Sequence, residues 1–459
     1  MIRPPSSDVP YQAAQRRMGI VRRRVNAITY RISIDNATIT AVSPTGVALV
    51  RGQRIPVRFD PEKRYWIIEA RTASKQVCFH SFITTPSTTV VQYQSLDRNF
   101  GLWSATQNLR EIMVSAPGTL SHLAINVTTA PGAGKSYAFE VLIAGLASGL
   151  IVTIADSATS GVDTVNAPAV TAGQRITLRS TPSGTPASTG NIHISWQFTP
   201  TTPGAIYASR LNGTLSATAV RYVNLGAADG EPYSSRPLAD SLWALGGTMD
   251  ALYVSLNSAP GAGRSFAFDL MRNGIVVGST LTIAGTDTAG SLSALGLTIT
   301  DMDLWALRIT PAGTPTLSQG AYGVAYTPTS PGQWSLGAMT SSGAIATDPA
   351  YDAFSGTNSW SAAETDALQR ILLPAGGAKP RVLGLRMDAD VAPGVGFAPA
   401  FTMRRESANA AIEITLTGIE TTASATGSVA LADGDDLALR ISGPEGALNN
   451  FRWAWQMRA

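Results

Sequence analysis

The fold is indicated by one short stretch, Ala130-Pro131-Gly132-Ala133-Gly134, which the chain repeats twice more. It returns as Ala259-Pro260-Gly261-Ala262-Gly263 and as Ala392-Pro393-Gly394-Val395-Gly396, so that successive prolines are 129 and 133 residues apart. Three other positions keep their distance from each proline: a leucine before it, and a phenylalanine and a branched aliphatic residue after it. A Leu-Arg pair further on keeps its distance to within one residue. These landmarks are Leu123, Leu252, Leu385; Phe139, Phe268, Phe401; Ile154, Ile283, Leu416; and Leu178-Arg179, Leu307-Arg308, Leu439-Arg440. Such agreement identifies a true internal repeat.

The repeat is long enough to be a complete domain. Solenoid units of about 20 to 50 residues cannot bury a core alone, whereas a unit of this length can. Apolar residues alternate with polar or small ones, as in 123–127 and 451–455, and Gly, Pro, Asn and Thr separate these runs. Alternation of this kind is typical of half-buried antiparallel strands. We therefore predict an all-β chain with three tandem jelly-roll-like antiparallel β-sandwiches.

Turn-forming residues cluster between the repeats and set the expected domain boundaries. Two of these linkers follow an aromatic strand that ends in Thr-Pro, where proline ends the pairing of strands. The expected organisation is a basic N-terminal arm (1–27), a small β anchoring domain (28–85) and three sandwiches (86–205, 214–330 and 333–459).

Composition narrows the class of protein. Of the 459 residues only 14% are charged, and the 43 glycines and 27 prolines favour sheets and turns over helices. The single cysteine, Cys78, excludes an intramolecular disulfide and a zinc site built on several thiolates. The Arg-rich start is not followed by the features of a signal peptide. The most apolar stretch, 141–155, is too short for a membrane span, and we expect it to form a strand, a turn and a second strand.

Positive charge is concentrated at the N-terminus. Residues 1–85 hold 14 lysines and arginines and 5 aspartates and glutamates, a net charge of +9, and the rest of the chain holds 20 and 26, a net charge of −6. The arm has weak helical amphipathicity, and its candidate anchoring residues are Arg16, Arg17, Arg22, Arg23 and Arg24. Three interpretations are open: a solvated tail, docking onto an acidic surface of an assembly, and contact with nucleic acid. The arm lacks the interleaved aromatic residues that stack on bases, which disfavours the third.

Gly132-Ala133-Gly134-Lys135-Ser136 is similar to the end of a phosphate-binding loop. The full motif needs a glycine where Thr129 stands, and a helix after it. The residues that follow, 137–139, alternate as in a strand. We therefore expect a turn before a strand and no nucleotide cofactor.

No catalytic or metal site is indicated by the remaining motifs. The acidic run Asp433, Asp435 and Asp436 invites a calcium interpretation, but its spacing is not that of a helix–loop–helix calcium site, and a solvated hairpin turn is the simpler prediction. Cys78 and His80 share a strand face without a further ligand pair nearby. None of the 3 histidines accompanies a glycine-flanked serine nucleophile. We expect no enzyme, no cofactor and no bound metal.

Tryptophans raise a carbohydrate hypothesis, because exposed aromatic faces stack on sugar rings. Trp453 and Trp455 alternate in one strand, which favours the core for this pair. Trp103, Trp243 and Trp360 do not keep the register of the repeat. We take these three as the candidate surface contacts to a glycan.

The repeat resembles a module found in structural proteins of tailed-bacteriophage virions. The resemblance lies in Leu-x7-Pro-Gly-Ala-Gly-Lys-Ser-Tyr-x-Phe and in the later Leu178 to Pro186, Leu-Arg-x-Thr-Pro-Ser-Gly-Thr-Pro. The second copy keeps the latter at 307–315, and the third has drifted to Ser442-Gly443-Pro444. The resemblance covers all but the N-terminal region. It implies a β-sandwich module in a tail, fibre or head-surface protein, and it implies no catalytic residues.

These observations together predict a structural component of a bacteriophage virion. The expected object is a fibre, spike or surface decoration, anchored through its basic N-terminal region, with sandwiches that contact the host. The expected partners are other virion proteins (capsid, portal or neck, or tail), two further copies in a homotrimer, and a host surface glycan, without membrane or specific nucleic acid. The alternative is a virion-bound glycan-binding or glycan-degrading protein for host recognition.

Overall fold

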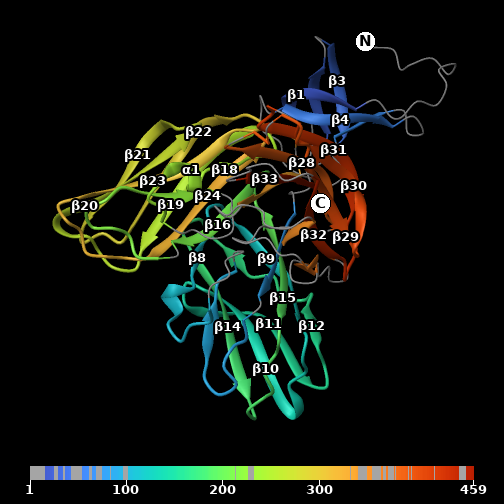
Figure 1. Ribbon diagram of the computed structural model, residues 1–459. Helices are drawn as coiled ribbons and strands as arrows, with labels where there is room; N and C mark the ends of the chain where they lie inside the picture. The colour runs from blue at the N-terminus through green and yellow to red at the C-terminus, as the bar shows by residue number, and fades with distance from the viewer. Residues whose placement is uncertain are drawn as a thin grey trace. The chain divides into compact units, whose positions relative to one another are not determined.

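The computed structural model divides the chain into two compact units, Met1–Thr72 and Ala73–Ala459, which are described separately (Figure 1). The residues that the structure describes are 16–24, 29–34, 37–42, 54–60, 65–68, 75–82, 84–96, 102–211, 213–225, 232–330, 332–339, 349–353, 363–364, 369–370, 377, 379–390, 392–393, 395–417, 419–443 and 451–458.

The first unit is a closed β-barrel with the strand order β1-β2-β3-β5-β4. Its strands are β1 (Arg16–Arg24), β2 (Thr29–Ile34), β3 (Ala37–Val42), β4 (Arg54–Asp60) and β5 (Tyr65–Ile68). β3 and β5 run parallel, and the other neighbours are antiparallel. This is the Greek-key order of a five-stranded OB-type barrel.

The barrel corrects the expected N-terminal arm. Arg16, Arg17, Arg22, Arg23 and Arg24 all lie in β1, a barrel strand, and not in a helical arm that ends at residue 27. The helical pattern was weak, and pairing of β1 with both β2 and β4 overrides it. The arm residues before position 16 lie outside the described residues.

The second unit begins with a sandwich of two sheets, ordered β12-β9-β15-β6 and β11-β10-β14-β7, with β13 beside β9 and β8 beside β14. A short 3-10 helix, η1 (Gln107–Leu109), precedes β8. The strands are β6 (Gln76–Phe82), β7 (Gln92–Gln94), β8 (Ile112–Met113), β9 (Gly118–Val127), β10 (Gly132–Ile143), β11 (Leu146–Asp156), β12 (Ser160–Asp163), β13 (Ala169–Val170), β14 (Arg175–Ser183) and β15 (Ile192–Pro200).

The second sandwich repeats this plan, with sheets ordered β16-β24-β19-β22 and β17-β23-β20-β21, and β18 beside β23. Its single described helix is the short α1 (Arg236–Ala239). The strands are β16 (Ala205–Leu211), β17 (Arg221–Asn224), β18 (Ser241–Leu242), β19 (Gly247–Leu256), β20 (Gly261–Arg272), β21 (Ile275–Gly285), β22 (Ala289–Ile299), β23 (Leu304–Ala312) and β24 (Gly320–Pro328).

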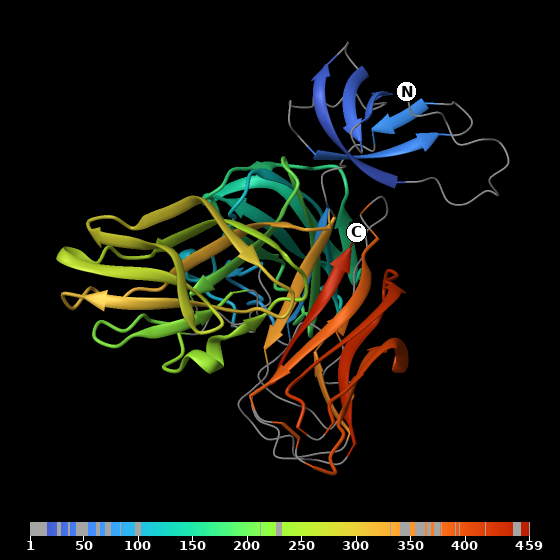
Figure 2. The same cartoon turned by 90° about the horizontal axis from the view of Figure 1, so that it is seen from above.

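The third sandwich has sheets ordered β25-β33-β28-β31 and β26-β32-β29-β30, with β27 beside β32. Figure 2 shows its strands in orange and red. They are β25 (Gln333–Met339), β26 (Ala350–Ala353), β27 (Gln369–Arg370), β28 (Arg381–Ala389), β29 (Ala400–Arg405), β30 (Ala408–Thr415), β31 (Thr422–Ala430), β32 (Asp436–Ser442) and β33 (Phe451–Arg458).

The three sandwiches share one topology, which confirms the predicted all-β fold. In each, the first strand pairs with the last, and the chain crosses repeatedly between two antiparallel sheets. This is the double Greek key of a jelly roll. Two boundaries were wrong. β6 belongs to the first sandwich because it pairs with β15 along its length, so this sandwich begins before residue 86 and the small β domain ends before residue 85. β16 pairs with β24, so the second sandwich begins before residue 214.

The hairpin predicted within 141–155 is present and recurs in the second copy. Ala144 and Gly145 join β10 to β11, and both have positive φ values (51° and 81°). Asn273 and Gly274 do the same between β20 and β21 (50° and 85°). Two consecutive positive φ angles define the two-residue turn that suits the twist of a hairpin.

The buried cores do not follow the sandwich boundaries equally. The first sandwich has its own apolar cluster, joined by Ile206 from β16. The second and third sandwiches share one continuous cluster, which also takes in Val77 from β6. We therefore correct the expectation of three separate cores to one core of the first sandwich and one that crosses from the second to the third.

Candidate functional site

The glycine-rich landmark is a turn that opens a strand. Gly132 and Gly134 have φ values of 98° and 71°, and Gly261 and Gly263 have 100° and 70°. The backbone N–H of Gly134 donates to Asp156 Oδ1 at 2.7 Å. A strand, β10, follows and not a helix. The glycines are required by these left-handed backbone angles, and the turn cannot form a phosphate-binding loop.

The arginine of the Leu-Arg landmark forms a cross-strand ion pair in the first two copies, whereas in the third copy Arg440 lies opposite Thr402. Arg308 on β23 donates to Asp269 on β20 through Nε (3.0 Å) and Nη2 (2.8 Å). Arg179 and Glu140 form the same pair in the first copy. In these two copies the arginine therefore ties two neighbouring strands of the sheet together.

The acidic turn of the third copy is also structural. Asp435 accepts hydrogen bonds from the backbone N–H of Ala432 (2.7 Å) and from Arg405 Nη2 (3.0 Å). In the second copy Asp303 accepts from the N–H of Thr300 (2.6 Å). A guanidinium beside Asp435 opposes a bound cation, and the described residues contain no group of three or more metal-binding side chains.

Two of the three candidate glycan contacts are buried. Trp103 is 7% exposed and donates to the Thr84 carbonyl (3.1 Å), and Trp243 is 0% exposed and donates to the Leu225 carbonyl (3.1 Å). Both indoles fill the apolar cores, so the expectation of exposed sugar-stacking faces was wrong for them. Trp360 lies outside the described residues. The core placement predicted for Trp453 and Trp455 is confirmed, since both are fully buried.

The described cysteine and histidines form no cluster. Cys78 is half-buried on β6, where it pairs in register with Trp196, and the side chain of His80 lies outside what the structure describes. His122 lies on β9 beside Ser121, with its Nδ1 3.0 Å from the Ser121 hydroxyl. Burial, with a smaller contribution from Lys75, lowers the pKa of His122, although Asp163 opposes this.

Polar residues converge instead at the contacts between sandwiches, which we call joints. At the first joint, β8 of the first sandwich lies against β16, β19 and β24 of the second. At the second joint, β18 lies against β25, β28 and β33. At the third joint, β27 of the third sandwich lies against β6 of the first.

These three joints join equivalent elements. β8, β18 and β27 each pair with the strand before the last, β14, β23 or β32. β16, β25 and β6 are each the first strand of their sandwich. The same head-to-tail contact therefore recurs three times and closes on itself. A heterologous contact that closes after three copies generates a ring, here one of three jelly rolls within a single chain.

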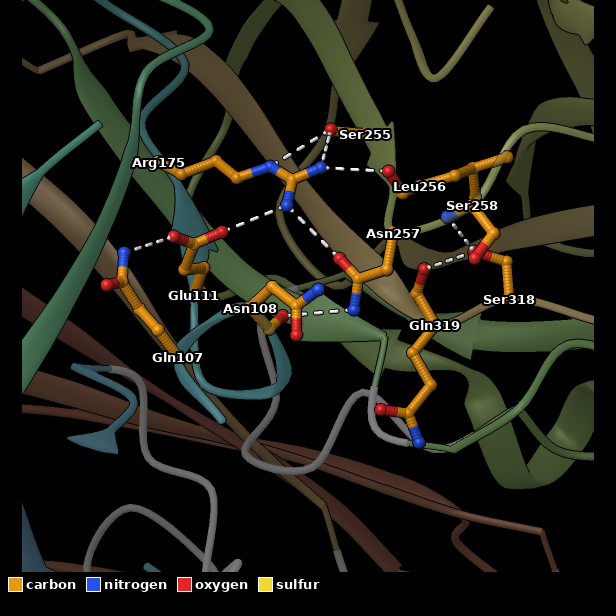
Figure 3. A network of polar contacts seen from close by, with 10 residues as sticks. All are labelled: Gln107, Asn108, Glu111, Arg175, Ser255, Leu256, Asn257, Ser258, Ser318 and Gln319. Carbon is orange, nitrogen blue, oxygen red and sulfur yellow. Dashed lines mark hydrogen bonds and ion pairs between the residues drawn. The ribbon is translucent and has the colours of Figure 1, made fainter. Parts of the chain in front are cut away.

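The first joint is centred on Arg175 at the start of β14 (Figure 3). Its Nη1 donates to Glu111 Oε2 at 2.9 Å within the first sandwich. Across the joint its Nε donates to the hydroxyl of Ser255 (3.0 Å), Nη2 to the carbonyl of Leu256 (2.9 Å) and Nη1 to Asn257 Oδ1 (3.1 Å).

Two further contacts complete this network. Gln107 donates to the second carboxylate oxygen of Glu111 at 2.8 Å. Asn257 Nδ2 donates back to the carbonyl of Asn108 at 3.0 Å. Glu111 and Arg175 expose only 10% and 21% of their side chains, so the ion pair is largely desolvated and its partners hold it in one geometry.

Close backbone approach also defines the first joint. A Cβ atom on Gly323 of β24 would lie 2.3 Å from the carbonyl oxygen of Met113 on β8. Only glycine fits such a contact without a shift of the backbone. Ala454 lies in β33, the counterpart of β24, and is packed against Leu242 and Ala244 of the second sandwich.

The second joint uses different side chains. The Tyr207 hydroxyl donates to the carbonyl of Ser335, and the backbone N–H of Ser335 donates to the Tyr326 hydroxyl at 2.9 Å. Arg386 Nε on β28 contacts both carboxylate oxygens of Asp301 (3.1 and 3.0 Å). At the first joint the contact to the first strand of the next sandwich, β16, is made by Gln76 of β6. Its side-chain amide accepts from the N–H of Ile206 (3.0 Å) and donates to the carbonyl of Ile206 (2.9 Å).

A charged cluster lies beside the second joint. Arg452 on β33 pairs with Asp388 (2.5 Å) and Asp390 (2.5 Å) and donates to the Pro237 carbonyl (2.8 Å) of the second sandwich. Burial raises the pKa of Asp388, and Arg452 only partly offsets this. Burial also raises the pKa of Asp240, against the opposing effects of Arg236 and Arg452.

Sequence reasoning missed the joints. Arg175 is in the first copy alone, since Leu304 begins the equivalent strand β23 and Asp436 begins β32. A charged residue that only one copy carries, at a position where the others differ, is the signal that could have indicated a copy-specific contact. Within the described residues of the joints, the polar contacts named above link one sandwich to the next.

Comparisons with known proteins add little to this geometry. No family model matches the chain, and no curated protein matches it. Among solved structures it is similar to the M60 catalytic domain with the CBM51-1 and CBM51-2 domains from Clostridium perfringens ZmpB, at 8% sequence identity and a TM-score of 0.19. The match covers 96% of this chain and 43% of that one, so the chain spans less than half of that protein. At this TM-score the likeness carries no functional argument. Within the described residues, no helix is long and apolar enough to cross a membrane.

Proposed function

We propose that this chain is a non-catalytic structural component of a bacteriophage virion. One observation carries the proposal: three jelly rolls form a closed ring, and the described landmarks of the repeat serve turns, cores and ion pairs. Jelly rolls of this plan occur in viral capsid and lectin domains. The resemblance of the repeat to modules of phage virion proteins supports the same class.

In this proposal the protein is a fibre, spike or surface decoration of the particle. The basic first unit anchors it to other virion proteins, and the jelly rolls of the second unit provide a rigid object for contact with the host.

Mass spectrometry of purified phage particles, combined with gold-labelled antibodies in electron microscopy, tests the proposal. The expected result is several copies per particle, with label at a fixed location on the head, neck or tail. Particles that lack the protein would overturn the proposal. If particles made without the protein keep their host range, the role in host contact is overturned and the role as a surface decoration stands.

The homotrimer stays a prediction. The ring of three jelly rolls within one chain weakens the symmetry argument for it. One chain already presents three equivalent domains, so a symmetric object does not require three chains. Light scattering of the full chain distinguishes a monomer from a trimer.

No observation favours the alternative function in host-glycan binding or degradation. The two described candidate tryptophans, Trp103 and Trp243, are buried, so neither offers an exposed ring on which a sugar could stack. Incubation of the full chain with host envelope polysaccharide, followed by assay of reducing ends, tests the enzymatic alternative directly. Release of reducing ends would overturn the non-catalytic assignment.

A further inference from the structure

The register of the barrel in the first unit gathers arginines onto one face. Residues paired directly across neighbouring strands share a face, and alternate residues of one strand belong to opposite faces. Arg16 of β1 pairs with Arg58 of β4, and Ile20 pairs with Arg54. Ile20 also pairs with Ser33 of β2. Arg16, Arg54 and Arg58 therefore share one face with Ser33.

A β-bulge brings further arginines to the same face. The register between β1 and β2 shifts between Val21 and Arg23, and Arg23 then pairs with Arg31. Arg31 is two residues from Ser33, so it belongs to the same face. Without the bulge Arg23 would fall on the opposite face, because a shift of one residue exchanges the two faces. The face that results carries Arg16, Arg23, Arg31, Arg54 and Arg58, and we call it the arginine face.

The opposite face of the same strands is apolar. Its members by register include Gly19, Val21, Ile32, Ile39, Ala41, Ile55, Val57 and Phe59. The register therefore separates an apolar face from the arginine face. Arg17 and Arg24 fall with the apolar set by register, so the anchoring set expected from the sequence divides between the two faces.

The arrangement of charge on this face is unfavourable in isolation. Arg16 lies directly opposite Arg58, and Arg23 lies directly opposite Arg31. Like charges in such cross-strand pairs destabilise a sheet. Asp60 is the one acidic residue in the described strands of the barrel. An anionic partner removes this repulsion, and five guanidinium groups bind planar oxyanions through paired hydrogen bonds.

Aromatic residues decide between the two common anionic partners. Single-stranded nucleic acid needs exposed rings on which bases stack. By register Tyr30, Phe59 and Trp66 fall on the apolar face and not on the arginine face. Tyr65, paired with Asp60, is the single aromatic residue that the described strands place on the arginine face. A carboxylate-rich protein surface needs no stacking platform.

We propose that the arginine face docks onto an acidic protein surface, rich in Asp and Glu carboxylates, on the assembly that carries this chain. The proposal rests on the proposed function and deepens it, because it names the anchoring residues and the chemistry of the partner. It replaces a flexible arginine-rich arm with a fixed cross-strand array on β4, β1 and β2.

Binding of the full-length protein to poly-L-glutamate, compared with a single-stranded DNA of equal charge, tests this inference. The test variant replaces Arg16, Arg23, Arg31, Arg54 and Arg58 with Gln. The matched control removes five positive charges from exposed positions of the second unit, namely Lys75, Arg264, Lys379, Arg381 and Arg458. Circular dichroism checks that both variants keep the β-sheet signal of the unmodified chain.

The expected result is that the test variant loses about tenfold or more in affinity for poly-L-glutamate, while the control changes little. Equal loss in the control would overturn the inference, because net charge and not a particular face would then explain binding. Tighter binding to DNA than to poly-L-glutamate, lost in the test variant, would overturn it in favour of a nucleic-acid surface.

Incorporation into phage particles separates this inference from the proposed function. If the test variant is absent from particles that incorporate the control, both stand. If the test variant incorporates normally, the arginine face is not the anchor, although the protein remains a virion component. If even the unmodified chain is absent from particles, the proposed function fails, whatever the binding to poly-L-glutamate.

Discussion

The first and second joints bring together equivalent strands, yet different chemistry holds them. At the first joint Arg175 spans the interface with hydrogen bonds to a hydroxyl, an amide and a carbonyl, and the two cores are largely separate. At the second joint one apolar core is continuous across both sandwiches. A backbone geometry can therefore recur while the side chains that stabilise it are replaced. We infer that the second and third sandwiches unfold together and that the first can separate.

The largest expected effect is at the second joint, in the substitution Tyr207→Ala. Tyr207 stacks on Tyr326 (ring centroids 5.5 Å apart) and meets Trp243 edge-on (4.9 Å). Loss of a buried aromatic ring costs about 3–5 kcal/mol. Calorimetry should show one lowered transition for the second and third sandwiches, with the first unchanged. Tyr207→Phe, which only leaves the Ser335 carbonyl without this donor, should cost about 1 kcal/mol. A uniform lowering of all transitions would contradict the comparison.

The next effect is expected at the first joint, in Arg175→Met. This change leaves the Glu111 carboxylate largely buried without its guanidinium partner, which costs about 3 kcal/mol. Hydrogen exchange should increase at residues 108–114 and 255–257, while the second joint keeps its protection. Arg179→Met is the control, because Arg179 pairs with Glu140 inside the first sandwich. Exchange at the first joint that increases equally in the control would show that Arg175 has no special role there.

A reciprocal pair of small substitutions compares the two joints more finely. In Gly323→Ala the new Cβ meets the Met113 carbonyl at 2.3 Å, so β8 must move, at a cost of about 1–3 kcal/mol. Ala454→Gly at the second joint removes a methyl group and should cost about 1 kcal/mol without separating the sandwiches. Limited proteolysis should release the first sandwich from the Gly323→Ala variant alone. Release from both variants, or from neither, would contradict the assignment.

The smallest effect concerns the dependence of the second joint on pH. Burial raises the pKa of Asp388 above its ordinary value of 3.8, so the folded state binds this proton more tightly than the unfolded state does. The stabilisation is then complete below 3.8 and is lost as pH rises through the raised pKa. The free energy of unfolding of the unmodified protein, minus that of Asp388→Asn, should fall as pH increases over this range. A difference that grows with pH would show that Arg452 outweighs burial at this site.

The sequence predicted the repeated turns and strands better than the strands whose partners lie far away in the sequence. The strand at Phe139 recurs in all three copies and the turn at Gly132 recurs at Gly261, so local angles and alternation were enough to place them. β6 was assigned to the wrong domain because its partner, β15, lies far away in the sequence. β1 was mistaken for an arm for the same reason, since its pairing with β4 is not a local property.

The candidate sites depended even more on tertiary structure. Trp103 and Trp243 left the register of the repeat, which suggested loops at the surface, but each indole fills a core and its N–H finds a backbone carbonyl. Burial of this kind is set by the opposite sheet and leaves no periodic signal in the sequence. The importance of Arg175 was equally invisible, because its partners lie about 80 residues further along the chain, on another domain.

Closure of the ring within one polypeptide has a consequence for how the object can evolve and assemble. Three separate subunits with this contact would dissociate on dilution and would have to change all their surfaces together, since one gene would encode every position. Here the covalent links make association independent of concentration, and each jelly roll can acquire its own loops and charges. The chain can thus present three unlike outer surfaces around a common centre, which a ring of identical subunits cannot do.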